Sequence, residues 1–203
     1  MSQVSVVIPA YNSADYLGEA LASVRAQTVQ PLEILVVDDG SADTTRDIAR
    51  QAGATVLETG KNGGPATARN LGIQEAGGDL IAFLDADDVW EPEQLQACAG
   101  LLDRYPEAAV AFSLVTQFGA ADQPQPAVLP EGVPVAAADF LWEQNPVIQS
   151  AAVARREALL AAGGYRDGMR HAEDYDLWLR LAQRHPFVCT HRRLVRYRVH
   201  AAQ

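Results

Sequence analysis

This sequence has little cysteine and no long hydrophobic run, and both absences narrow what the protein can be. Its two cysteines, Cys98 and Cys189, have no metal-type spacing, so we expect two small buried side chains in a reducing compartment. No apolar run approaches the ~18 residues of a membrane-spanning helix, and the first residues lack the features of a signal peptide. We therefore predict no transmembrane segment and a cytoplasmic location, either in solution or at the inner face of a membrane.

Positive charge is also scarce. The chain carries 16 Lys and Arg against 26 Asp and Glu, which gives a formal net charge of −10. Because an acidic chain repels phosphate backbones, we expect no nucleic-acid partner. Basic residues gather near the end of the chain, where they form either a solvated strand or a contact for an anionic membrane surface: Arg192, Arg193, Arg196 and Arg198.

Strand and helix signals alternate through the first half of the chain. Runs of apolar residues predict strands at 4–8, 34–37, 54–57, 80–84 and 109–112. Apolar residues at helical spacing predict helices between these strands, such as 15–27 and 92–105. The alternation predicts a single α/β domain over 1–203, with a Rossmann-like, mostly parallel central sheet flanked by helices.

The second half of the chain is less regular. Its patterns predict a loop over 119–135, helices at 136–144, 155–162 and 174–184, and strands near 148–153 and 194–199. We expect the regular half, 1–112, to bind a nucleotide and the irregular half, 113–203, to shape the site of a second substrate.

Three carboxylates follow the apolar run 80–84 directly: Asp85, Asp87 and Asp88. Such a run is typical of a central strand that is buried on both faces. Open α/β sheets bind ligands at the carboxyl ends of their strands, and clustered carboxylates there can hold a divalent cation that in turn holds a diphosphate. The alternative is that these acids cap the following helix.

Polar residues also follow the other strands of the first half. The dinucleotide pattern GxGxxG and the Walker P-loop are both missing, so this edge would bind its ligand by other means. A mononucleotide fits the residues present, because Tyr11 can pack on a base or ribose and Asp39 can accept a hydrogen bond from the imide of uracil or thymine. Arg69 can meet a phosphate or pair with an acid, whereas a turn, a helix cap and a surface helix are the structural alternatives for these three positions.

A second acidic cluster precedes an amphipathic segment at 177–181. On a helix, Asp174 shares the apolar face and would look into a cleft, where a partly buried carboxylate can act as a general base. A helix cap is the alternative role for this residue. Asp176 lies four residues before Arg180 and predicts a surface ion pair.

Together these segments resemble the family 2 glycosyltransferases, which use the A-type glycosyltransferase fold. The segments that carry the resemblance are VSVVIPAYN (4–12), VVDDGSAD (36–43), NGG (62–64), ARNLG (68–72), FLDADD (83–88), EDYDLW (173–178) and YRVH (197–200). Each motif is weak alone, but the whole set in this order is specific.

The resemblance implies a role for individual residues. The nucleotide-binding residues would be Pro9, Ala10, Tyr11, Asn12, Asp39, Arg69 and Asp85. Asp85-Ala86-Asp87 matches the D-x-D motif, so Asp87, together with His200, would hold Mn²⁺ or Mg²⁺. Asp174 matches the catalytic base of an inverting mechanism.

The resemblance also implies an activity. We expect transfer of a sugar from a nucleoside diphosphate, with UDP ahead of dTDP, to the hydroxyl of a glycan or lipid-linked acceptor, in surface polysaccharide or glycolipid synthesis. The alternatives are an inactive nucleotide-sugar-binding subunit and a sugar nucleotidyltransferase. The latter would need a glycine-rich loop after the first strand, where this chain has Pro9-Ala10-Tyr11-Asn12.

Overall fold

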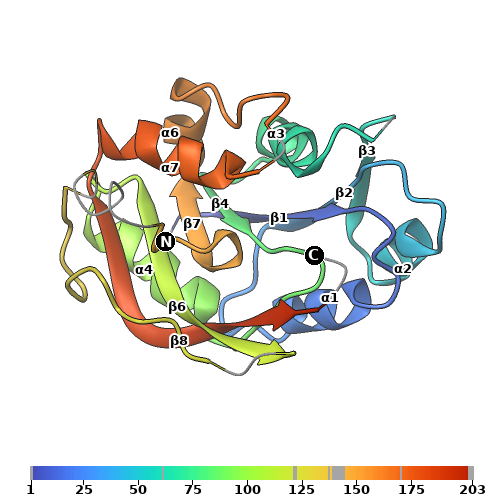
Figure 1. Cartoon of the computed structure of the whole chain (residues 1–203), viewed down its shortest axis with the longest axis horizontal. Helices are drawn as coiled ribbons and strands as arrows, with labels where there is room; N and C mark the ends of the chain where they lie inside the picture. Colours follow the sequence, from blue (N-terminus) through green and yellow to red (C-terminus); the bar gives the residue numbers. More distant parts are fainter. Residues whose placement is uncertain are drawn as a thin grey trace.

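The computed structural model describes residues 2–60, 62–120, 123–136, 138, 145–169 and 171–200. Over these residues the chain forms one eight-stranded mixed sheet, in the order β3-β2-β1-β4-β7-β6-β8-β5 (Figure 1). This arrangement confirms the predicted single-domain α/β fold with helices on both faces.

The first four strands form a parallel block. They are β1 (Val4–Ala10), β2 (Glu33–Asp38), β3 (Thr55–Glu58) and β4 (Leu80–Phe83), joined through α1 (Leu17–Arg25), α2 (Thr45–Gln51) and α3 (Pro65–Glu75). All four were predicted within two residues. Their carboxyl ends point to the same edge of the sheet, as parallel crossover connections require.

The other strands are paired less regularly. β5 (Val89–Trp90), β6 (Val110–Gly119), β7 (Ala152–Arg155) and β8 (Phe187–Val199) follow, with α4 (Gln94–Arg104), the short 3-10 helix η1 (Gln149–Ala151), α6 (Arg156–Ala161) and α7 (Glu173–Ala182). β7 is antiparallel to both β4 and β6, β5 is antiparallel to β8, and β6 is parallel to β8. The sheet is therefore mixed, with its parallel pairs concentrated in the first half.

Some predictions for the second half need correction. β6 and β8 are much longer than predicted, because polar residues in β6 and charged residues in β8 hid their extent in the sequence. The segment 148–153 holds η1 before β7 begins, and most of the predicted helix 136–144 lies outside the described residues.

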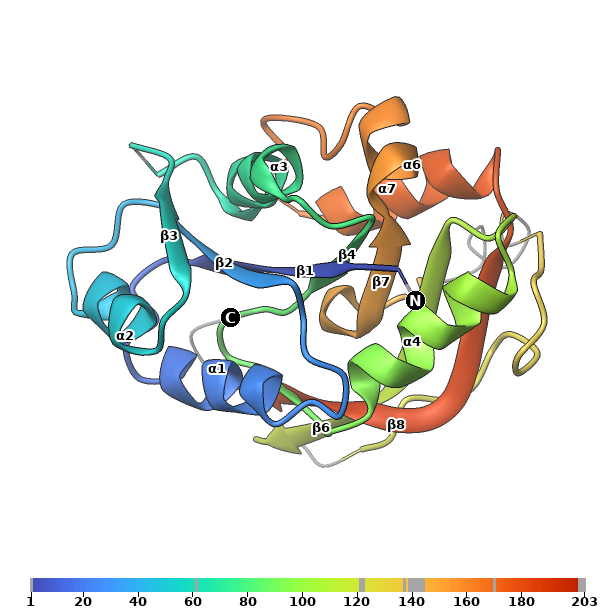
Figure 2. The ribbon, with the colours of Figure 1, turned by 180° about the vertical axis from the view of Figure 1, so that it is seen from behind.

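The helices cover the sheet in two layers. α3, α6 and α7 lie on one face, whereas α1, α2 and α4 lie on the other (Figures 1 and 2). Trp178 of α7 is fully buried against Phe83 and Phe187, which anchors this helix beside the end of β4. Among the described residues, no helix combines the length and apolar character that a membrane crossing needs.

Both cysteines are buried and unpaired, as predicted. Burial raises the pKa of the Cys98 thiol to about 12 and that of the Cys189 thiol to about 11. Both therefore behave as small apolar core residues.

Candidate functional site

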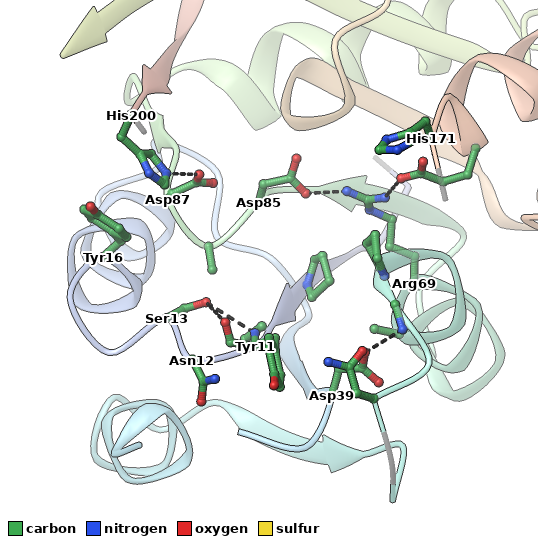
Figure 3. Close-up of a pocket in the computed structure, with 18 of the residues that line it drawn as sticks. Tyr11, Asn12, Ser13, Tyr16, Asp39, Arg69, Asp85, Asp87, His171 and His200 are labelled. Carbon is green, nitrogen blue, oxygen red and sulfur yellow. Dashed lines mark hydrogen bonds and ion pairs between the residues drawn. The ribbon is translucent and has the colours of Figure 1, made fainter. Parts of the chain in front are cut away.

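A cavity of about 750 Å³ lies at the carboxyl edge of the parallel strands. Its walls come from segments far apart in the sequence, which Figure 3 shows converging around one space. The predicted nucleotide and metal residues all line it: Pro9, Ala10, Tyr11, Asn12, Asp39, Arg69, Asp85, Asp87 and His200. Asp174 is not among the lining residues, although its neighbour Glu173 is.

The loop after β1 forms one wall of the cavity. Tyr11 is 50% exposed, so its ring is available to a ligand. Asn12 has a φ of 48°, a left-handed conformation that asparagine tolerates better than most residues. Its backbone N–H donates to Ser41 Oγ at 2.9 Å, and its side-chain oxygen accepts from the Ala42 N–H at 2.8 Å. These bonds fix the β1 loop to the β2 loop.

Asp39 orders a third loop. Its Oδ1 accepts from Thr59 Oγ1 at 2.6 Å and from the Gly63 N–H at 3.0 Å, and its Oδ2 accepts from the Gly64 N–H at 2.7 Å. A carboxylate offers about four acceptor positions, so three are used and one can serve a ligand. Asp39 is thus more than a turn residue: it positions the glycine loop before α3 and lines the cavity.

The three acids after β4 point in different directions. Asp85 and Asp87 line the cavity, whereas Asp88 is fully buried. The expectation that all three lie at the strand mouth is therefore wrong for Asp88. Burial, followed by the charge of Asp85, raises the pKa of Asp88 to about 8.

Arg69 is enclosed between two acids. Its Nη2 lies 2.6 Å from Asp85 Oδ1 and its Nη1 lies 2.9 Å from Glu173 Oε1, with only 6% of its side chain exposed (Figure 3). Its guanidinium carbon also lies 5.6 Å from the centre of the Tyr165 ring. Of the two roles that the sequence left open, the structure shows pairing with acids.

The first turn of α7 carries Glu173 and Asp174. Asp174 Oδ2 accepts from Asn145 Nδ2 at 3.3 Å, and Oδ1 accepts from the Tyr175 N–H at 2.7 Å. Burial raises the pKa of Asp174. The positive charge of Arg69 acts to lower this pKa, whereas the negative charge of Asp85 acts to raise it. Asp174 directly follows Glu173, which lines the cavity, so it lies beside the cavity on its α7 side without lining it.

The predicted pair between Asp176 and Arg180 is present at 2.8 Å. Arg180 also donates to the carbonyl oxygens of Ala162 and Gly164, so it does more than pair on the surface. It fixes α7 to the segment after α6.

Two metal-type donors meet at one end of the cavity. His200 Nε2 lies 2.9 Å from Asp87 Oδ2, and the two residues are 113 positions apart in the sequence (Figure 3). Carboxylate and imidazole are both ligands of Mn²⁺, so this pair fits such an ion when further oxygens come from a ligand and water. Within the described ranges, three or more His, Cys, Asp or Glu residues do not gather into a metal-binding group.

Comparison with known proteins decides the family. A model described as Glycosyl transferase family 2 matches residues 5–199. The chain belongs to this family. An uncharacterized glycosyltransferase of Rickettsia prowazekii is 30% identical over 209 residues, which cover 98% of this chain and 65% of that protein. The chain thus spans less than two thirds of the length of this relative.

Solved structures share the fold. The S. aureus TarS 1-349 structure in complex with UDP superposes with a TM-score of 0.81 at 24% identity, covering 97% of this chain and 60% of that one. The mannosyltransferase PcManGT of Pyrobaculum calidifontis, solved with GDP-Man and Mn²⁺, gives a TM-score of 0.71 at 21% identity, covering 94% of this chain and 55% of that one. At these identities the likeness shows a shared fold alone.

Some site residues had no role predicted from the sequence. Glu173 lines the cavity and pairs with Arg69, but a glutamate in the first turn of a helix is common. Ser150 contacts two of the acids after β4, and a single serine before a short apolar run carries no recognisable signal.

Proposed function

We propose that this chain is an inverting, metal-dependent glycosyltransferase that moves a sugar from a UDP-linked donor to an acceptor hydroxyl. The observation that carries the proposal is the convergence of Asp39, Asp85, Asp87 and His200 on one cavity at the carboxyl edge of the sheet, in a family 2 chain.

The donor would lie along the β1 and β2 loops. Tyr11 packs on the uracil or its ribose, and Asp39 uses its remaining acceptor position for the uracil imide N–H. Pro9, Ala10 and Asn12 complete this wall, and Asp85 accepts from the ribose hydroxyls. The TarS complex with UDP supports a uridine donor. A thymine nucleotide presents the same imide edge and is the natural competitor.

Asp87 and His200 would hold the divalent cation, Mn²⁺ or Mg²⁺. The cation, when bound, supplies Lewis-acid stabilisation of the negative charge that develops on the departing diphosphate. The Mn²⁺ in the PcManGT structure supports a divalent cation beside the donor, and the 2.9 Å contact between Asp87 and His200 supports these two residues as its ligands. Arg69 would act on the nucleotide through Asp85, because both of its terminal nitrogens already face carboxylates.

Asp174 would be the general base. It accepts the proton of the acceptor hydroxyl as that oxygen attacks the anomeric carbon from the face opposite the diphosphate, which inverts the configuration. Its raised pKa brings it closer to the pKa that proton transfer near neutral pH requires. Glu173 is less suited to this role, because Arg69 holds its carboxylate in an ion pair.

We assign 1–112 to the donor and 113–203 to the acceptor. The acceptor would be a glycan or a lipid-linked glycan of surface polysaccharide or glycolipid synthesis. A lipid-linked acceptor would bring the protein to the inner face of the membrane from the cytoplasm.

The test combines turnover with binding. Release of UDP from a panel of UDP- and dTDP-sugars is measured with and without Mn²⁺, and Asp174→Asn is compared with wild type. We expect this variant to lose transfer by ~10²- to 10⁴-fold, the typical contribution of a general base, while UDP affinity by calorimetry stays unchanged. Asp176→Asn, on the same helix turn, is the matched control and should keep activity.

One observation favours a second candidate, a nucleotide-sugar-binding subunit without transfer activity: Asp174 does not line the cavity. Such a protein would bind UDP and release no diphosphate from any donor. Near wild-type transfer by Asp174→Asn would instead show that another group is the base.

A further inference from the structure

A buried junction lies directly behind the candidate metal donors. Its centre is the Ser150 hydroxyl, which accepts from the Asp85 N–H at 3.0 Å and donates to Asp88 Oδ2. Both Ser150 and Asp88 are fully buried, so neither side chain reaches the cavity. Ser150 therefore ties η1 to the loop that carries Asp85 and Asp87.

The other oxygen of Asp88 holds the end of β8. Asp88 Oδ1 accepts from the Arg198 N–H at 2.8 Å, two residues before His200. The Arg198 side chain donates its Nε–H to the Asp87 carbonyl oxygen at 2.7 Å. The same guanidinium lies 4.9 Å from the centre of the Tyr16 ring, and the His200 ring lies 5.0 Å from that of Tyr16.

These contacts link donors that the sequence separates widely. Asp87 and His200 lie 113 residues apart in the sequence, and the segments that carry them meet where β5 pairs with β8, with Val89 opposite Arg196. The Asp88 carboxylate bridges the two segments through main-chain and buried side-chain bonds, which are stiffer than contacts between exposed side chains. Small displacements of a metal ligand strongly reduce the affinity for the metal. A change in this junction that moves Asp87 or His200 should therefore weaken cation binding.

We propose that Asp88 and Ser150 are positioning residues that set the separation of Asp87 and His200 for the cation-bound donor. This inference rests on the proposed function, because it assumes a cation at that pair. Asp88 acts through Arg198. Ser150, in turn, acts through Asp88. Neither Asp88 nor Ser150 touches the substrate.

The chain provides a matched control for Ser150. Ser5, also fully buried, accepts from the Gly78 N–H at 2.9 Å and donates to Glu33 Oε1 at 2.6 Å. It therefore has the same chemistry as Ser150, but it lies near the amino end of β1, away from the cavity. Ser5→Ala and Ser150→Ala should lose similar amounts of stability.

The experiment measures UDP affinity by calorimetry with and without Mn²⁺. We expect Ser150→Ala to weaken Mn²⁺-dependent UDP binding by ~10- to 100-fold, the usual effect of altering a residue behind a metal ligand. Metal-free UDP affinity should fall far less, because Arg69 still holds the Asp85 carboxylate. Excess Mn²⁺ should restore binding, which a folding defect would not allow. Ser5→Ala should behave as wild type in both titrations.

Asp88→Asn is the second variant, because it keeps the shape of the side chain. Its amide oxygen can still accept from the Arg198 N–H, but its NH₂ removes the acceptor for the Ser150 hydroxyl. We expect a smaller loss in the same direction.

If wild type binds UDP with Mn²⁺ dependence and both variants match Ser5→Ala, the positioning role is overturned while the proposed function stands. If wild-type UDP affinity is independent of Mn²⁺, the metal-dependent function and this inference are both overturned.

Discussion

The two halves of the sheet are assembled in different ways. In the parallel half, β1 to β4 come from consecutive strand-helix units, and the whole block spans residues 4–83. In the other half, β7 is inserted between β4 and β6, and β8 lies between β6 and β5. The comparison shows that the parallel half is built from contacts close in sequence, whereas the other half depends on pairing between distant segments.

Two consecutive residues of α3 join the halves. Arg69 pairs with Asp85 on one side and Glu173 of α7 on the other. The Asn70 side chain exchanges two hydrogen bonds of 2.8 Å with the backbone N–H and carbonyl of Tyr165. The contacts at the boundary between the two halves of the sheet are thus polar, and removing them should destabilise both halves.

The most damaging way to break this boundary is Arg69→Met. It leaves Asp85 and Glu173 without a counter-charge in a largely buried site, so we expect a loss on the order of 3 kcal/mol in the free energy of unfolding. Urea denaturation measures this loss. UDP affinity should fall as well, because Asp85 would no longer be held in place.

Arg50→Met provides the contrast within the parallel half. Arg50 also faces two acids, Asp47 and Glu58, but 55% of its side chain is exposed. Exposed pairs contribute ~0–1 kcal/mol, so the stability should hardly change. Equal losses for the two arginine variants would contradict the view that the boundary is a special structural element.

Gly72→Ala tests how closely a helix packs on the sheet in the parallel half. A Cβ on Gly72 would lie 2.4 Å from Val7 Cγ1, because α3 packs closely on β1 in the parallel half. We expect a destabilisation of ~1–3 kcal/mol from overpacking. Gly100 of α4 has open space around the same position, so Gly100→Ala should raise stability by up to ~1 kcal/mol. Thermal unfolding of both variants measures the two signs.

The smallest effect concerns the pH dependence that Asp174 of α7 would give to activity. Because burial raises the pKa of Asp174, a base at this position is protonated at acidic pH, and kcat/KM should rise with pH through that raised value. Asn145→Leu removes a donor that favours the carboxylate, so the acidic limb should move to higher pH. An unmoved limb, measured with one donor across the pH range, would argue that Asp174 does not carry the titrating proton.

The parallel half was predictable because its signals are local. The strand before Asp85 is a continuous apolar run, and Asp39 follows another, so their meeting at one edge follows from the rules of parallel sheets. The second half was predicted less well, since β8 carries several arginines along an otherwise apolar strand. Those arginines lie beside β6, Phe118 and Asp87 in the fold, and these partners are distant in the sequence.

The sequence by itself determined the alternation of strands and helices in the first half, because burial and amphipathic faces depend on residues a few positions apart. Its motifs, through their resemblance to family 2 glycosyltransferases, indicated the family and the nucleotide and metal residues that line the cavity. Only the tertiary structure decided that Arg69 pairs with acids and that Asp88, unlike Asp85 and Asp87, enters the core. The Asp88 carboxylate is held there by Ser150 and the Arg198 N–H, 62 and 110 residues away, and contacts at such separations exist only after the two halves have packed together.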